Sequence, residues 1–498
     1  MTTLIKYILW LLAVLCASSV SAQSYTAKVQ DATTKTPIPF VTIQYGEHSG
    51  TITNEDGVFT LREEEILKIK DSVRITSMGY EEKSIWIPSH RDTIIYLASK
   101  AFELKGVFLS SNPLSMEQII DSVNANLTKN YEPSSLSQKR VFFRKSSLSD
   151  MNKIDFDFKK STIEEFNEKF LDSVVSLVPR NSEYYQEMAG DIYGNYSDNK
   201  LVIDKGASLY DKSKDISMDG ISETIERVFK EKVKPDSYFK IKSGLFSTKV
   251  QVDSILQSNE DAEKVAEKVT EDENEWTFTK QMKNQVAAIY KELLFNEDSK
   301  LDMLRKSNRY DFTQEDYTYI NNEPVYIIHF EPKWKKDFKG TLYINTEDFA
   351  VVRADFENVR PLFKVGLLGI RYGEDVYNGT MLFQKGDAGV YSPKYINLNR
   401  GSYFGVDRPL KIIEKNKHVK GRRKQNELSF EIDVAGTQLD KFELVVFNTV
   451  AIASDVYKST VENKDIEATY LPKYDPDFWK GYTIMEPNAA IQAFEVVE

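Results

Sequence analysis

The chain has few of the residues on which covalent and metal chemistry depend. Its 498 residues contain one cysteine, which excludes a disulfide-stapled scaffold. The G-x-S-x-G, P-loop and G-x-G-x-x-G motifs are missing as well. None of the four histidines belongs to the HExxH motif of a metallopeptidase, and they lie far apart in the chain, as His48, His90, His329 and His418. We therefore predict no catalytic residue, no metal ligand and no cofactor-binding residue.

One pair of residues leaves a metal site open as an alternative. His329 and Glu331 are separated by one residue in a predicted strand, so their side chains would share one face of it. In the alternative, His329 binds no metal and its hydrogen bonds only stabilise the fold.

Positive charge and long apolar runs are also scarce. Lys and Arg number 65 against 76 Asp and Glu, which gives a formal net charge of −11. This acidic balance argues against a nucleic-acid-binding protein, because such proteins carry a basic excess. After the N-terminus, the longest apolar stretches are residues 362–370 and 444–453. Both are shorter than the roughly 20 residues that a transmembrane helix needs.

The N-terminus has the pattern of an export signal. Lys6 precedes an apolar run that ends at Cys16, and small residues lead to Ala22, so we predict a signal peptide over residues 1–22. An uncleaved anchor is disfavoured because the run is too short to cross a bilayer. A lipid on Cys16 is disfavoured because Leu15 stands where a small residue belongs. Cleavage would remove the only cysteine, and the loss of Lys6 would change the net charge from −11 to −12. We expect an exported protein of the periplasm or the periplasmic face of the outer membrane.

Residues 23–105 are predicted to form a small all-β domain. Turn-forming residues separate short β-branched runs about every ten residues, which is typical of a β-sandwich. The predicted strands are 25–29, 40–44, 57–61, 72–77, 82–87 and 92–97. Gly57 and Gly79 are expected in turns that need a positive φ, and Phe59 and Tyr80 are expected to fill the core.

The spaced residues of this domain resemble the carboxypeptidase-regulatory-like domain. The motifs are Pro37-x-Pro39-Phe40-Val41, Gly50-Thr51-x-Thr53-Asn54-x-Asp56-Gly57-x-Phe59 and Asp71-Ser72-Val73-x-Ile75-x-Ser77-x-Gly79-Tyr80. The resemblance implies a transthyretin-like (prealbumin-like), seven-stranded β-sandwich with an accessory role, of a kind that recurs in cell-envelope proteins. Asn54 departs from the aspartate that is usual at this position, although it keeps a side chain that can form the turn.

A helical junction and a larger α+β domain are predicted to follow. In the junction, residues 106–135, Ser115 and Gln118 have the spacing of a capping box before an amphipathic helix. Residues 136–498 read as helices over 163–177, 220–229 and 286–295, with a short helix at 301–304, and then as a curved antiparallel meander. The hairpin pattern of residues 337–351 resembles the curved sheets of lipoprotein carriers. The aromatic segment 474–487 is expected to close across the sheet as a strap; a lip that stacks on a sugar or a peptide is the alternative.

Charge is unevenly distributed along this second domain. The acidic stretch 260–275 is expected to be a solvated surface. Seven cations gather around a predicted hairpin tip and form a candidate contact for an anionic surface such as a lipid head group; a soluble loop tip is the alternative. They are Lys411, Lys415, Lys417, Lys420, Arg422, Arg423 and Lys424.

Together these patterns predict a non-catalytic cell-envelope protein of a diderm bacterium. It would have a binding or assembly role and could hold an apolar or lipid-like ligand, with envelope proteins, lipid or glycan as partners. Two alternatives remain open. An outer-membrane β-barrel is disfavoured because helices interrupt the strands and the final residues lack an aromatic. A hydrolase with an unrecognised site is the other.

Overall fold

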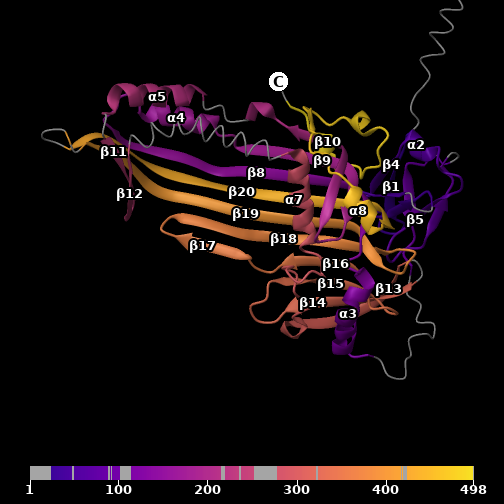
Figure 1. The fold of residues 1–498 in the computed structure, drawn as a ribbon. Helices are drawn as coiled ribbons and strands as arrows, with labels where there is room; N and C mark the ends of the chain where they lie inside the picture. Colours follow the sequence, from indigo (N-terminus) through magenta and orange to yellow (C-terminus); the bar gives the residue numbers. More distant parts are fainter. Residues whose placement is uncertain are drawn as a thin grey trace, which may run out of the picture. The chain divides into compact units, whose positions relative to one another are not determined.

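A computed structural model describes residues 24–46, 50–87, 90, 92–100, 114–214, 219–234, 237–251, 277–320, 323–416, 418 and 423–496 (Figure 1). The chain forms two compact units. Unit 1 comprises Met1–Gly106, Thr318–Pro324 and Asp475–Ala493, and unit 2 comprises Val107–Tyr317, Val325–Tyr474 and Phe494–Glu498. Strands dominate, so the predicted fold class, mainly β with α, is confirmed. The predicted signal peptide and the acidic stretch 260–275 lie outside the described residues.

In unit 1, the described residues form seven strands in two sheets, ordered β4-β1-β7 and β3-β2-β5-β6. Six strands overlap the predicted ranges, and the seventh, β3, falls in the Gly50-Thr51 motif, which is too short to be recognised from its pattern. The strands are β1 (Tyr25–Asp31), β2 (Thr42–Gln44), β3 (Gly50–Ile52), β4 (Val58–Leu61), β5 (Val73–Thr76), β6 (Lys83–Ile85) and β7 (Ile94–Leu97), and helix α2 (Glu63–Ile66) follows β4.

Alternate residues of these strands fill the space between the two sheets. Val29, Phe59 and Ile75 are fully buried. Gly57 and Gly79 have φ values of 75° and 77°, which confirms the predicted turns. At Gly57 a Cβ atom would lie 2.7 Å from the Val29 carbonyl oxygen, so both the backbone angle and the close approach require glycine.

The C-terminal segment Asp475–Ala493 belongs to unit 1. Within this unit the segment is hydrogen-bonded to the sandwich. Thr51 Oγ1 donates to the Ile484 carbonyl at 3.1 Å, and Arg62 pairs with Glu486 at 3.1 Å. The segment contains the short helices η4 (Pro476–Trp479) and α9 (Ala489–Gln492), and the Trp479 side chain is fully buried.

The described strands of unit 2 form one open, curved and mainly antiparallel sheet of 14 strands. Its main path runs β13-β14-β15-β16-β18-β19-β20-β8-β9-β10-β21. The bounds are β8 (Ser137–Ser161), β9 (Asn181–Gly194), β10 (Asn199–Tyr210), β11 (Ser237–Ser243), β12 (Phe246–Gln251), β13 (Tyr310–Ile320), β14 (Glu323–Pro332), β15 (Phe338–Asn345), β16 (Val351–Asn358), β17 (Phe363–Leu367), β18 (Ile370–Lys385), β19 (Tyr391–Asn416), β20 (Lys424–Ala451) and β21 (Thr469–Leu471).

Three neighbouring strands of this sheet are unusually long. Strands β8, β19 and β20 have 25, 26 and 28 residues, which at about 3.3 Å per residue makes each roughly 80 Å or more in length. The sequence predicts two shorter strands in place of each, because bulges and polar stretches interrupt the alternation. These are 140–147 and 153–158 in β8, 390–398 and 408–413 in β19, and 427–434 and 442–449 in β20. One such bulge lies between Ala435 and Thr437, where β20 pairs with β8.

The two faces of the sheet differ in polarity, and we call them the polar face and the apolar face. Met381, Ile396, Leu444, Phe143 and Met188 are successive register partners on five strands, and they mark the apolar face. Their sequence neighbours Thr380, Asn397 and Glu443 point to the opposite, polar face, since side chains alternate along a strand.

Helices cover parts of the apolar face. Helix α7 (Phe278–Tyr290) packs on β10, where the Phe278 ring occupies the space above Gly206. The ring of Tyr131, at the end of α3 (Met116–Tyr131), lies 4.9 Å from that of Phe295 and 5.1 Å from that of Phe383. Helices α4 (Glu168–Leu177) and α5 (Asp219–Lys232) lie at the end of the sheet that carries β11 (Figure 1).

The predicted helices are mostly present, with shifted ends. The capping box of α3 is confirmed, because Ser115 Oγ accepts from Gln118 N at 3.2 Å and Gln118 Oε1 accepts from Ser115 N at 2.8 Å. Helix α4 begins later than predicted, at the Asn167 cap. Helix α7 begins at the Thr277 cap and ends at Tyr290. Residues 301–304 are not helical, so that prediction is wrong.

In the part of the chain that the structure describes, no helix is long and apolar enough to cross a membrane.

Candidate functional site

A continuous row of polar side chains crosses the polar face at right angles to the strands. Each strand contributes one residue, and each is the register partner of the next, so all of them point to the same side. The row consists of His329, Thr341, Asp355, Thr380, Asn397, Glu443, Arg144 and Glu187. Sequence reasoning missed this row, because the registers that align eight separate strands are not visible in any one strand.

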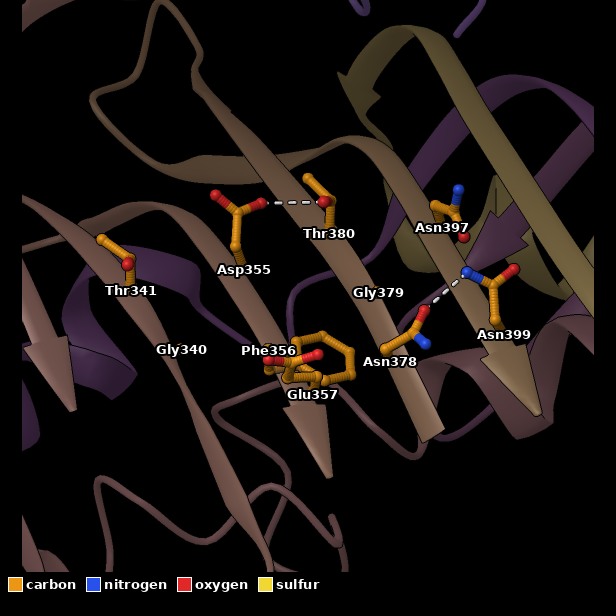
Figure 2. A pocket seen from close by; sticks show the side chains of 10 residues that line it. All are labelled: Gly340, Thr341, Asp355, Phe356, Glu357, Asn378, Gly379, Thr380, Asn397 and Asn399. Carbon is orange, nitrogen blue, oxygen red and sulfur yellow. Dashed lines mark hydrogen bonds between the residues drawn. The ribbon is translucent and has the colours of Figure 1, made fainter. Parts of the chain in front are cut away.

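Part of the row lines a polar groove with a volume of about 290 Å³. Asp355 accepts a hydrogen bond from Thr380 at 2.7 Å and another from Arg353 at 2.8 Å. Asn399 Nδ2 donates to Asn378 Oδ1 at 2.7 Å. Figure 2 shows the Asp355–Thr380 and Asn378–Asn399 pairs on neighbouring strands. The lining residues are Gly340, Thr341, Asp355, Phe356, Glu357, Asn378, Gly379, Thr380, Asn397 and Asn399.

Asn397 differs from its neighbours in the groove. Its side chain points to the same side of the sheet as those of Asp355 and Thr380 (Figure 2), and the residue is only 9% exposed. Among the described residues, Asn397 Oδ1 has no hydrogen-bond partner. A buried carbonyl oxygen without a partner costs about 1–3 kcal/mol, so this atom is suited to accept a hydrogen bond from a ligand.

The row ends in a buried ion cluster. Arg144 is 1% exposed and pairs with Glu187 at 2.6 Å and with Glu443 at 3.8 Å. Tyr395 donates to Glu443 at 3.1 Å. Burial would lower the pKa of Arg144, but the two carboxylates outweigh it, and the pKa is raised. Arg144 therefore stays charged, and the groups of the cluster bond to one another, which is typical of a structural element.

A second cavity, of about 210 Å³, lies on the apolar face near α4. Seven apolar residues line it, namely Ile163, Phe166, Val233, Phe239, Ile241, Ile412 and Leu428, and its polar lining consists of Glu414, Asn426 and Glu427. The Glu414 carboxylate is buried and accepts hydrogen bonds from Ser237 at 2.7 Å and Asn426 at 2.6 Å. Because the Glu414 carboxylate and the Asn426 amide are bonded to the protein, the cavity is available to an apolar guest.

The predicted basic cluster begins beside this cavity. The hairpin is present, with Asn416 N donating to the Arg423 carbonyl. Glu427 is 3% exposed and forms ion pairs with Lys411, at 2.8 Å, and with Lys424. Lys415 and Lys424 are register partners across the hairpin. The remaining cations, Lys417, Lys420 and Arg422, lie outside the described residues.

The structure brings the possible metal pair together. His329 Nε2 lies 3.4 Å from Glu331 Oε1, as their spacing predicted. In the described ranges, no three His, Cys, Asp or Glu side chains lie close enough to hold a metal ion. His48 lies outside those ranges.

Two buried lysines were not identified from the sequence. Burial lowers the pKa of Lys139 to about 8 and that of Lys394 to about 8. Lys139 Nζ lies 4.5 Å from the centre of the Tyr196 ring and contacts Ser137 Oγ. Lys139 lies on the apolar face, in phase with Phe143, and Lys394 lies at the bulge opposite Leu382 and Phe383. For Lys139, its spacing of four residues from Phe143 can be read from the sequence, but a lysine in a strand is normally expected to be exposed.

Residues 25–109 match the family model of the CarboxypepD_reg-like domain. The resemblance of the N-terminal domain is thereby confirmed.

A search of the curated proteins found no match. A solved Vibrio parahaemolyticus domain, assigned to an outer membrane lipoprotein-sorting protein, is 8% identical and has a TM-score of 0.21; the likeness covers 69% of this chain and 97% of that chain. The Pseudomonas aeruginosa MucA/MucB complex is 7% identical with a TM-score of 0.16, and covers 68% and 99%. At these TM-scores the likenesses carry no argument about function.

Proposed function

We propose that this is a non-catalytic cell-envelope protein, of the periplasm or the periplasmic face of the outer membrane, that binds an anionic, lipid-like ligand. The apolar cavity near α4 carries the proposal. Its volume of about 210 Å³ exceeds the roughly 150 Å³ apolar cavity that accepts benzene. A short hydrocarbon chain or the end of a longer one fits such a space, and its burial removes apolar surface from water.

The charge beside the cavity favours an anionic head group. Glu427 lines the cavity and is paired with Lys411 and Lys424, so cations begin at the cavity wall. The β19–β20 hairpin adds Lys415 and Arg423 within a chain whose net charge is −11. A ligand with its chain in the cavity would bring a carboxylate or phosphate near these cations, which attract negative charge.

Binding of a fluorescent fatty acid tests this function. The delipidated chain from Gln23 is titrated with cis-parinaric acid, and saturable binding that oleate displaces is expected. Leu428→Trp fills the cavity and should abolish binding. The matched control is Leu439→Trp on the same strand, where Leu439 is 36% exposed and does not line the cavity. The double variant Lys415→Gln/Arg423→Gln should weaken binding and reduce its dependence on salt. Absence of saturable binding to the unaltered protein would refute the proposal.

The Asn397 side chain favours a second class of ligand, a glycan. Its partnerless Oδ1, beside the Asp355 carboxylate and the Thr341 hydroxyl, would accept donors from a glycan rich in hydroxyl and amide groups. Titration with N,N′-diacetylchitobiose, followed by NMR, tests this candidate. Asn397→Asp keeps an acceptor and should retain binding, whereas Asn397→Leu removes it and should not.

A further inference from the structure

The β17–β18 hairpin exposes a set of large apolar side chains that no described element covers. Every residue of β17 is exposed. The hairpin crosses from β17 to β18 at Leu368 and Gly369. The exposed fractions are 51% for Phe363, 43% for Val365, 65% for Leu367, 47% for Leu368, 45% for Ile370 and 38% for Tyr372. Isolated exposed apolar residues are ordinary, but a contiguous group of six marks an interaction surface.

Five of these side chains share one side of the hairpin, and Leu368 lies in its turn. Val365 pairs with Tyr372, and Leu367 pairs with Ile370, so their side chains point the same way. Tyr372 is the register partner of Phe404, which is itself 39% exposed. The surface therefore continues from the hairpin onto the apolar face of the sheet.

The turn of this hairpin is strained. Leu368 has a φ of 51° and Gly369 a φ of 82°, the combination of a two-residue turn in which Asn-Gly is preferred. A leucine in the left-handed region is uncommon, because its Cβ approaches the backbone. Leu368 is also 47% exposed. Its left-handed backbone conformation and its contact with water therefore both disfavour a leucine at this position. Strain of this kind is a reason to look for function.

Positive charge lies on the other side of the hairpin. Lys364 and Arg371 alternate with the apolar residues, and the side chain of Arg371 lies over Gly405 on the polar face. Between Phe363 and Tyr372 there is no acidic residue, although acids outnumber bases in the whole chain, and the next acid along β18 is Glu374, opposite Phe363 at the base of the hairpin. An apolar tip backed by cations is complementary to a surface that offers hydrocarbon below anionic head groups.

We propose that the β17–β18 hairpin inserts its tip into the interface of a lipid bilayer. The apolar side chains would enter the boundary between head groups and acyl chains, to the depth of about 5–10 Å reached by interfacial segments. Lys364 and Arg371 would contact anionic phosphates. Tyr372, whose ring centre lies 5.9 Å from that of Phe363, has the apolar body and polar tip that suit this depth. The hairpin shares no residue with the apolar cavity, so this proposal stands or falls separately from the ligand proposed for that cavity.

Vesicle co-sedimentation of the chain from Gln23 tests the insertion. We expect binding to phosphatidylglycerol/phosphatidylethanolamine vesicles that exceeds binding to phosphatidylcholine vesicles. Burial of one leucine changes a partition constant by about tenfold or more, so Leu367→Ser/Leu368→Asn should lower partitioning at least tenfold. Asparagine is favoured at a left-handed position, so Leu368→Asn alone should leave the melting temperature unchanged or higher.

Control variants distinguish vesicle binding by this surface from nonspecific adsorption and from misfolding. Val461→Ser removes another exposed apolar side chain of unit 2, 81% exposed, and should bind vesicles as the unaltered protein does. Leu368→Trp should show a blue-shifted emission on adding vesicles, and binding of cis-parinaric acid should be equal in all variants. The proposal is overturned if the unaltered protein does not sediment with anionic vesicles, or if the double variant binds them equally well. It is also overturned if the double variant instead abolishes a dimer in sedimentation equilibrium, because the occupant is then a second copy of this chain.

Discussion

Asn54 Nδ2 donates a hydrogen bond to the carbonyl oxygen of Pro487 at 2.9 Å. Its Oδ1 accepts from the backbone N–H groups of Asp56 and Val58, at 3.0 and 2.9 Å, and so holds the turn before β4. An aspartate could accept the same two bonds, but it has no donor for Pro487. The departure from the usual aspartate at this position thus has a physical reason: the amide both forms the turn and binds the C-terminal segment.

The substitution Asn54→Asp should therefore release the C-terminal segment without destroying the sandwich. The new carboxylate would place an acceptor against an acceptor at a buried position, which costs about 1–3 kcal/mol. We expect faster chymotryptic cleavage in the aromatic segment 478–482 and increased exposure of Trp479. Asn195→Asp is a matched control, because the turn role of Asn195 rests on Oδ1, which accepts from Ser197 N and Asp198 N. Equal cleavage rates in the two variants would contradict this role for the amide donor.

The buried ion cluster on the polar face gives a second prediction. Arg144→Met leaves Glu187 and Glu443 buried without their guanidinium partner, and loss of one partner of a buried pair costs about 3–5 kcal/mol. The double variant Arg144→Met/Glu187→Met removes one of the orphaned charges and should be more stable than the single variant. Urea unfolding of both proteins measures the difference. A single variant as stable as the unaltered protein would show that the cluster is not desolvated.

The cap of helix α3 gives a third prediction. Ser115→Ala removes the acceptor for Gln118 N and should lower the free energy of unfolding of unit 2 by about 1 kcal/mol. Ser115→Asp keeps an acceptor and adds a negative charge at the helix N-terminus, so it should be at least as stable as the unaltered protein. Denaturation of the two variants, monitored by circular dichroism, checks the order. Equal loss in both would mean that the cap contributes nothing.

Local rules predicted the sandwich and the α3 cap because each depends on residues close in sequence. Gly57, Gly79 and the pair Ser115 and Gln118 act within a few positions, and all lie where the patterns placed them. The polar row could not be predicted in this way. Thr341, Arg144 and Glu187 become neighbours in one row only through strand registers set by bulges and by the whole sheet.

The basic cluster and the two buried lysines likewise show that sequence patterns do not reveal which charged groups are buried or paired. The pattern identified Lys411 and Lys424 as surface cations, but it could not show that they share the buried partner Glu427. No sequence pattern singled out Lys139 or Lys394 as buried. Their burial depends on tertiary packing, such as that of Tyr196 above Lys139.

The buried lysines predict that stability rises with pH in a defined window. The pKa of Lys139 and that of Lys394 are each lowered to about 8, against 10.5 for an ordinary lysine. Between those values the unfolded chain binds more protons than the folded chain, so the free energy of unfolding increases as pH rises. The gain is at most about 1.4 kcal/mol per pH unit for each lysine. Below pH 8 both states are protonated and this contribution is flat.

Replacing one buried lysine measures its contribution to the pH dependence of the free energy of unfolding. Above about pH 10, buried tyrosines with raised pKa values, such as Tyr196, oppose the trend, because the unfolded chain loses those protons first. The measurement is therefore urea unfolding at about pH 8, 9 and 9.5, inside the window between the folded and unfolded pKa values. Lys139→Met removes a buried amine and should show about half the gain of the unaltered protein, whereas Lys160→Met, at an exposed position of the same strand, should show all of it. A slope that is the same in Lys139→Met as in the unaltered protein would mean that the Lys139 amine reaches water in the folded state.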